Sequence, residues 1–261
     1  MPDPTPSYEV IDCHFHPAVD AHTSSGWFQS CGDMPAQIAA LRRLGIARAC
    51  GTVVRGTQPA SFGDVRALND QALALRDRFP DFYIPGIHIH PRFPDESCAE
   101  IARCCGREGV RWIGELVGYI MGYGNDYATA DALTVFREAA RHRAAVSMHC
   151  NDADVVERLC RGVPELNVVL AHIRADRDDI LMRIGLVAQF PNLHLDISGP
   201  GISRLGVLRK AMDLAGKEKI LFGTDYPVNN PAVFLHGALF EALRGEEYEA
   251  CFSGNFKRLC T

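Results

Sequence analysis

Short apolar runs alternate with longer segments along the whole chain. The short runs are rich in Val, Ile and Leu and are often bounded by Gly, Pro, Asp or Asn, which is typical of buried β-strands. Eight runs are predicted as strands: residues 9–16, 47–54, 82–90, 111–118, 144–150, 167–173, 193–199 and 219–227.

The segments between these runs have apolar residues every three or four positions, as amphipathic helices do. The segment that starts at Met34 places its apolar residues on one face and stops at Gly45. Another segment opens on Asp131, which we expect to cap its helix. The predicted helices are residues 34–45, 64–80, 131–143, 152–161, 176–189, 202–215 and 231–257.

Strand alternating with helix predicts parallel strands joined by right-handed crossovers. Eight such units in 261 residues favour an α/β fold of the closed (β/α)8 TIM-barrel type, with residues 1–261 as a single domain. An open doubly wound sheet would usually carry a glycine-rich phosphate loop after its first strand. Here that position holds "HFHPAVDAH", so the barrel is preferred.

Composition narrows the class of partner. The chain is 47% hydrophobic and 23% charged, with a formal net charge of −5, so it lacks the basic footprint of a nucleic-acid-binding protein. No apolar run reaches the ~20 residues of a membrane-spanning helix. The ten cysteines form no CxxC pair and no signal peptide is visible, which indicates a cytoplasmic protein with free thiols. We expect a small-molecule substrate, no membrane, and nucleic acid as an unlikely partner; a homo-oligomer is compatible with the sequence.

The first predicted strand ends in the sequence "DCHFHP". Side chains two apart on a strand point to the same side. We therefore expect Asp12, His14 and His16 on one face, and Cys13 and Phe15 on the other. Two histidines in this pattern are also compatible with an ordinary solvated face, so they decide nothing alone.

The catalytic groups of such barrels sit at the C-terminal ends of the strands. The polar residues that we expect there are His14, His16, His88, His90, Glu115, His149, His172 and Asp225. A lone histidine is more often a satisfied core residue, but Glu115 in an apolar strand must be paired, protonated or bound to a cation. Imidazoles and carboxylates converging at one end of a barrel favour a divalent metal, and this mixed donor set suits zinc, manganese or iron better than calcium.

The order of these pieces resembles the amidohydrolase superfamily of metal-dependent TIM-barrel hydrolases. The matching pieces are "DCHFHP", "GEL", "MHCND", "VVLAHI", "LHLDISG", "ILFGTDYP" and "GNFKRL", which together span nearly the whole chain. The chain looks closest to the amidohydrolase-related (amidohydrolase 2) branch, which also includes decarboxylases, and the tail from "LDISG" through "FGTDYP" carries this likeness. The segment from "GIHIHP" to "IGELVGY" is similar to TatD-like nucleases of the same superfamily.

The resemblance implies one or two divalent ions, with zinc favoured and manganese or iron as alternatives. The implied metal ligands are His14, His16, Glu115, His149, His172 and Asp225. In a two-ion site Glu115 would bridge the ions, and this is the arrangement we favour. In a one-ion site the ligands would be His14, His16, His149 and Asp225, and His172 would polarise the substrate.

The expected reaction is hydrolysis of an amide, ester, lactone or phosphoester. A bound divalent cation lowers the pKa of its water to about 7. Asp225 would take the second proton of that water and pass it to the leaving group, so Asp225 and His172 are the catalytic candidates. Expected substrate contacts are His90, Arg55, Arg174 and Tyr119.

Other polar residues near the strand ends are expected to support the ligands. Asp12 lies one layer deeper than the two histidines of "DCHFHP" and is interpreted as their support. Asp196 and Ser198 on the seventh strand would either orient a ligand histidine or close a barrel layer.

Three alternatives remain open at this point. A non-oxidative decarboxylase or hydratase would suit an arginine that holds a substrate carboxylate. A TatD-like deoxyribonuclease fits the acidic chain poorly. A non-enzymatic binding module would require the convergent ligands to be merely structural.

Overall fold

Eight parallel strands, hydrogen-bonded in sequence order, form one sheet in the computed structural model. The model describes residues 7–20, 23, 27–28, 30–241 and 243–260. The strands are β1 (Val10–Asp12), β2 (Ile46–Gly51), β3 (Tyr83–Ile87), β4 (Trp112–Leu116), β5 (Ala145–Met148), β6 (Val168–Leu170), β7 (Leu193–Asp196) and β8 (Ile220–Leu221). The sheet closes where Cys13 N–H donates to Phe222 O at 2.9 Å. The predicted single-domain TIM barrel is therefore confirmed.

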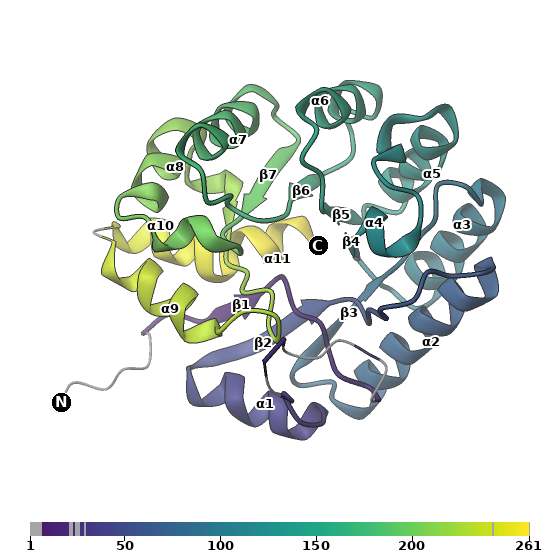
Figure 1. Cartoon of the computed structure of the whole chain (residues 1–261), viewed down its shortest axis with the longest axis horizontal. Helices are drawn as coiled ribbons and strands as arrows, with labels where there is room; N and C mark the ends of the chain where they lie inside the picture. The colour runs from purple at the N-terminus through teal and green to yellow at the C-terminus, as the bar shows by residue number, and fades with distance from the viewer. Residues whose placement is uncertain (1–6, 21–22, 24–26, 29, 242, 261) are drawn as a thin grey trace.

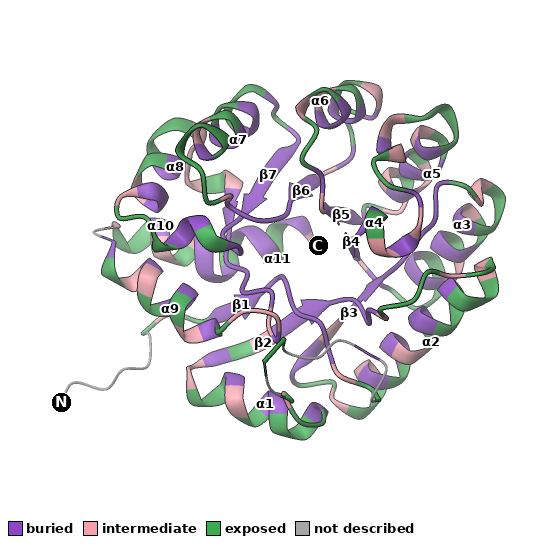
Figure 2. Cartoon of the chain, in the orientation of Figure 1, coloured by how far each residue is buried: buried purple, intermediate pink, exposed green. Residues whose placement is uncertain are grey.

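Most of the helices form a ring around the strands, whereas α11 lies across one end of the barrel (Figure 1). The helices are α1 (Met34–Arg43), α2 (Phe62–Arg78), α3 (Pro94–Ile101), α4 (Gly118–Met121), α5 (Ala130–Arg141), α6 (Ala153–Gly162), α7 (Arg177–Gln189), α8 (Val207–Ala215), α9 (Pro231–Phe240), α10 (Gly245–Glu249) and α11 (Asn255–Leu259). Figure 2 shows buried strands and helices whose inner faces are buried while their outer faces are exposed. None of the helices in the described part of the chain has the length and apolarity that crossing a membrane requires.

Three helix predictions need correction. The long helix expected over 231–257 is divided into α9, α10, a π-helical segment (Ala250–Gly254) and α11. The segment crosses residue 242, which lies outside the described residues. Helix α5 is capped by Thr129, whose hydroxyl accepts the Ala132 N–H at 3.2 Å, and Asp131 lies in the first turn instead. The sequence pattern did not predict helix α3 or the π-helix after it (Ala102–Arg107), although Pro94 at the first position of α3 is a helix-start signal.

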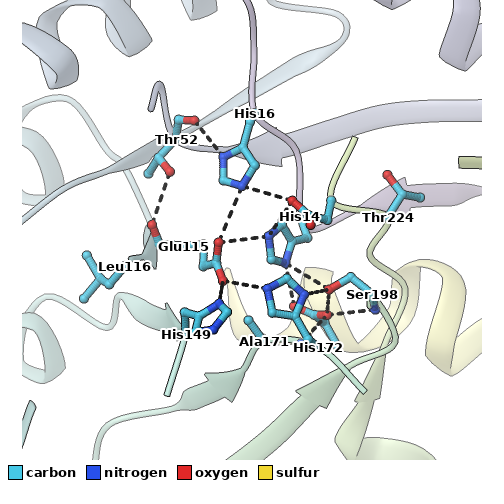
Figure 3. A network of polar contacts seen from close by, with 12 residues as sticks. His14, His16, Thr52, Glu115, Leu116, His149, Ala171, His172, Ser198 and Thr224 are labelled. Atoms are coloured by element: carbon cyan, nitrogen blue, oxygen red, sulfur yellow. Dashed lines mark hydrogen bonds and ion pairs between the residues drawn. The ribbon is translucent and has the colours of Figure 1, made fainter. Parts of the chain in front are cut away.

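The expectation that Cys13 and Phe15 share one face is wrong, because the chain bends immediately after β1. Cys13 packs with Ile11 in the apolar cluster inside the barrel, whereas Phe15 joins the core between the strands and the helices. His14 and His16 both point toward Glu115 (Figure 3). The bend thus brings the two imidazoles inward.

Asp12 holds this bend in place, as expected of a supporting residue. Its buried Oδ1 accepts the backbone N–H groups of His14 and Thr224, both at 3.0 Å. Its Oδ2 accepts the Thr224 hydroxyl. Burial raises the pKa of Asp12 to about 7 against the opposing effect of these hydrogen bonds. The carboxylate therefore ties the end of β1 to the loop that follows β8.

The barrel interior is filled by an apolar cluster that we call the inner cluster. Its members are Ile11, Cys13, Cys50, Trp112, Ala145, Val169, Leu221, Phe256 and Leu259. Most of them come from different strands, and the last two come from α11. The C-terminal helix therefore closes the N-terminal end of the barrel and leaves the opposite end to the loops.

Gly51 at the end of β2 offers a test of this packing. A Cβ there would lie 1.7 Å from the Phe15 carbonyl oxygen. Because backbone would have to move, we expect Gly51→Ala to lower the free energy of unfolding by about 3 kcal/mol. Gly185→Ala in α7 is the matched control, since nothing lies within 4 Å of its added Cβ. Denaturant unfolding of both variants checks this, and equal stability of the two would contradict the packing described.

Candidate metal centre

The centre of the site is the carboxylate of Glu115, the fourth residue of β4. Its Oε2 lies 3.2 Å from His14 Nε2 and 3.5 Å from His16 Nε2. Its Oε1 lies 3.1 Å from His172 Nε2 and 3.3 Å from His149 Nδ1. Each carboxylate oxygen thus faces a different pair of imidazoles, as Figure 3 shows.

Asp225 completes the side of the site that carries the first histidine pair. Its Oδ1 lies 3.4 Å from His16 Nε2 and 3.6 Å from His14 Nε2. Its Oδ2 accepts from Asn229 Nδ2 at 3.1 Å. The backbone φ is 59° at Asp225 and 72° at His172, a region that costs non-glycine residues energy. The fold holds both residues in this strained conformation, which directs them into the site.

The outer nitrogens of three imidazoles bind groups deeper in the barrel. His14 Nδ1 lies 2.9 Å from Asp196 Oδ2, and His172 Nδ1 lies 2.9 Å from Ser198 Oγ. His16 Nδ1 contacts the Thr52 carbonyl oxygen at 3.3 Å. These contacts leave each Nε2 facing the centre. Of the two roles expected for the β7 residues, orienting histidines is the one the structure supports.

The buried charges of the site stabilise one another. Burial lowers the pKa of His14, but the carboxylates of Glu115 and Asp196 more than offset this and hold the pKa well above its usual value. Burial also lowers the pKa of His16, but hydrogen bonds to Asp225 and Glu115 outweigh burial and raise that pKa to about 9. Burial raises the pKa of Glu115, yet the imidazoles around it keep that pKa well below its usual range. The site therefore favours positive charge beside ionised carboxylates.

The donor set fits a divalent metal. Both oxygens of the buried Glu115 carboxylate face imidazole nitrogens, and a buried carboxylate of this kind is stabilised by a cation. Among the described residues, three donor groups have their ligand atoms within 4.8 Å of one another: His14–His16–Glu115, His14–His172–Asp196 and Glu115–His149–His172. Imidazole and carboxylate donors together are the ligands that zinc and manganese accept. The first and the last of these groups share Glu115, so the donor set is compatible with one ion or with two.

A cavity of about 540 Å³ opens onto these donors. Arg55, Arg174 and Tyr119 line it, so three of the four expected substrate contacts are brought to the site. Arg55 pairs with Asp20 at 3.0 Å. The Tyr119 ring meets the His149 ring edge-on at 5.3 Å between centroids. Further apolar lining comes from Trp27, Val54, Val117, Ile120 and Val228.

His90, the fourth expected substrate contact, is not brought to this cavity. Its Nε2 lies 3.1 Å from the Met121 carbonyl oxygen and its Nδ1 accepts the Arg92 N–H at 3.2 Å. The ring packs against Phe93 and Tyr123. His90 therefore joins the loop after β3 to α4, and the expectation that it binds substrate is corrected.

Two residues at the site were missed by the sequence reasoning. Asn229 binds Asp225 and lines the cavity, and Trp27 lines the same cavity with 78% of its surface exposed. The only signal for Asn229 was its position four residues after Asp225. Trp27 lies in a polar loop whose sequence carries no periodicity, so it offered no signal.

A β/α barrel that carries such metal donors at the C-terminal ends of its strands is typical of metal-dependent barrel enzymes. The family model described as amidohydrolase matches residues 11–259. The chain therefore belongs to the amidohydrolase family, as its motifs indicated, and is a metal-dependent enzyme of that superfamily with a divalent-metal site. A comparison with curated proteins found no match.

Solved structures of similar fold include several decarboxylases. The 2,6-dihydroxybenzoate decarboxylase from Rhizobium is 15% identical with a TM-score of 0.73, over 97% of this chain and 98% of that one. The 5-carboxyvanillate decarboxylase from Sphingomonas paucimobilis is 14% identical with a TM-score of 0.74, over 97% and 99%. The dihydroxybenzoic acid decarboxylase from Polaromonas sp. JS666, solved with manganese and 2-nitroresorcinol, is 14% identical with a TM-score of 0.71, over 97% of each chain. At these identities the likeness shows the fold alone.

These comparisons bear on two expectations. They give no support to the TatD-like features that the segment around Glu115 suggested. The similar folds include decarboxylases and a protein described as a putative amidohydrolase from Staphylococcus aureus, so fold similarity does not decide between the two reactions. The family match shows a metal-dependent enzyme, and hydrolysis with zinc stays a prediction.

The contact between Asp196 and His14 predicts a measurable effect on metal binding. Asp196→Asn keeps the shape but removes the charge that fixes the imidazole, so we expect metal affinity to fall about 10- to 100-fold. Asp213→Asn on the exposed face of α8 is the matched control and should leave the affinity unchanged. Calorimetric titration of the chelator-treated protein with Mn²⁺ measures both, and equal affinities would refute the role of Asp196.

Proposed function

We propose that the chain is a metal-dependent, non-oxidative decarboxylase of a small aromatic carboxylate. The observation that carries this proposal is Arg174, a guanidinium that lines the same cavity as the metal donors. Among the described residues, no carboxylate forms an ion pair with it. A planar guanidinium without a partner binds a substrate carboxylate in a two-pronged manner. The aromatic acids named for the similar folds are of this substrate class.

We propose that His14, His16 and Asp225 would hold one ion and that His149 and His172 would hold a second, with the Glu115 carboxylate shared between the two sets of ligands. Manganese is favoured because similar folds were solved with it, and zinc or iron suits the same donors. When bound, the cation supplies positive charge that withdraws electron density from substrate oxygens.

The chain's own residues then account for binding and proton transfer. Arg174 anchors the carboxylate, while Tyr119 and the neighbouring apolar side chains contact the ring. When carbon dioxide leaves, the electron pair of the broken C–C bond stays on the ring carbon, which must receive a proton. Asp225 is the proposed proton carrier: its carboxylate would first take a proton from solvent and then deliver that proton to the ring carbon. Asn229 holds the outer oxygen of Asp225 and so fixes the direction of transfer.

A metal-dependent hydrolase is the second candidate, and the position of Glu115 favours it. A carboxylate whose two oxygens face separate donor pairs suits a two-ion site, and such sites often serve hydrolysis. In that reaction Asp225 would accept a proton from the attacking water and deliver it to the leaving group of an ester, lactone or amide.

An assay panel separates the two candidates. The metal-loaded protein should release carbon dioxide from 2,6-dihydroxybenzoate or a related hydroxybenzoate and leave lactones and esters intact. Arg174→Met should lower kcat/KM at least about 100-fold, mainly through KM, because the anchor of the carboxylate is lost. The matched control is Arg177→Met, since Arg177 is 83% exposed and contacts the neighbouring Asp178.

Hydrolysis without carbon dioxide release would reject the decarboxylase and support the second candidate. Equal activity of the Arg174→Met and Arg177→Met variants would reject Arg174 as the substrate anchor.

A further inference from the structure

A second cavity, of about 300 Å³, lies at the end of the barrel opposite the metal centre. It is bounded by the N-terminal parts of β1 to β4 and by α11. Its lining combines charged side chains with apolar ones, and those that carry the argument are Arg48, Trp112, Ile84, Pro85 and Phe256. The active sites of such barrels lie at the opposite end, so the charged side chains that line this cavity need another explanation.

Arg48 is the residue that sets this cavity apart. It pairs in register with Ile11 and lies two residues before Cys50, and both belong to the inner cluster. Its guanidinium therefore occupies an inward-facing position of β2, where an apolar side chain is usual. Its Nε is buried without a hydrogen-bond partner, and within the described part of the chain no carboxylate forms an ion pair with it. A partly buried cation without a counter-charge is costly.

The other charged residues of the cavity do not supply that counter-charge. Arg76 binds Glu108 at 3.1 Å, and Lys257 binds Glu9. Arg111 donates to the backbone carbonyls that precede β4, at 2.9 and 3.0 Å. Both carboxylates are thus already paired, and the lining keeps an excess of positive charge although the whole chain carries −5.

The floor of the cavity is aromatic and contains a second unsatisfied donor. Trp112 is fully buried, and its Nε1 has no hydrogen-bond acceptor. Its ring packs against Phe256 at 5.2 Å between centroids. Ile84 and Pro85 add apolar surface beside it. The cavity thus combines a flat apolar wall with two unpaired N–H donors.

We propose that this cavity is a second binding site, which takes a small aromatic carboxylate through Arg48 and Trp112. The guanidinium would pair with the carboxylate, the indole N–H would donate to the same group, and the ring would lie on the apolar wall. The volume suits a single ring with its substituents. The site is separate from the metal centre, and the inference does not rest on the proposed function.

Two-dimensional NMR of protein with ¹⁵N-labelled tryptophan tests the site, because the chain has only two tryptophans. A Trp27→Phe variant assigns the indole signal of Trp112. Titration with benzoate should shift that signal saturably. Arg48→Met should weaken binding at least about tenfold, whereas Arg174→Met, the matched arginine variant at the metal centre, should leave it unchanged.

Two further ligands decide the chemistry in the wild-type protein, whatever the stability of the variants. Benzyl alcohol keeps the ring without the charge, and inorganic phosphate keeps the charge without the ring. Each should bind at least about tenfold more weakly than benzoate. No saturable shift, a shift lost only with Arg174→Met, or equal binding of either control ligand would overturn the proposal.

Discussion

The structure depends on the burial of one carboxylate. Glu115 is 4% exposed and sits among four imidazoles, two facing each of its oxygens. An ionised carboxylate in such a place is stable only if positive charge surrounds it. The imidazoles supply part of that charge, and a divalent cation supplies it most directly. The rest of the site is arranged around this requirement.

The barrel meets this requirement by bringing five strand ends to one point. Asp12 ties the end of β1 to the loop after β8, and Asp196 fixes the ring of His14 from β7. His172 and Asp225 adopt backbone conformations that cost energy. The inner cluster and α11 close the far end of the barrel. The stability of that packing offsets the strain and the buried charge at the other end.

The alternation of strand and helix was sufficient to predict the barrel, and strand-end position indicated most of the side chains that meet around Glu115. The strand pattern could not show the bend after β1, because an ideal two-residue repeat places Cys13 and Phe15 on the same face. Strand-end position could not exclude His90 either, because its ring nitrogens bind the Met121 carbonyl oxygen and the Arg92 N–H only in the folded chain. The cavity around Arg48 was equally invisible, since one arginine in a strand has no sequence mark that it lacks a partner. Tertiary contacts decide all three.

The central claim is that Glu115 joins two metal positions. Measuring the metal content of the protein tests this claim most directly. Protein stripped with a chelator, reloaded with Mn²⁺ and freed of excess metal would be analysed by elemental mass spectrometry, beside Glu115→Gln treated identically. The account predicts two equivalents per chain for the wild type and at most one for the variant, because the amide cannot supply the shared negative charge. The same metal content in both proteins would contradict it.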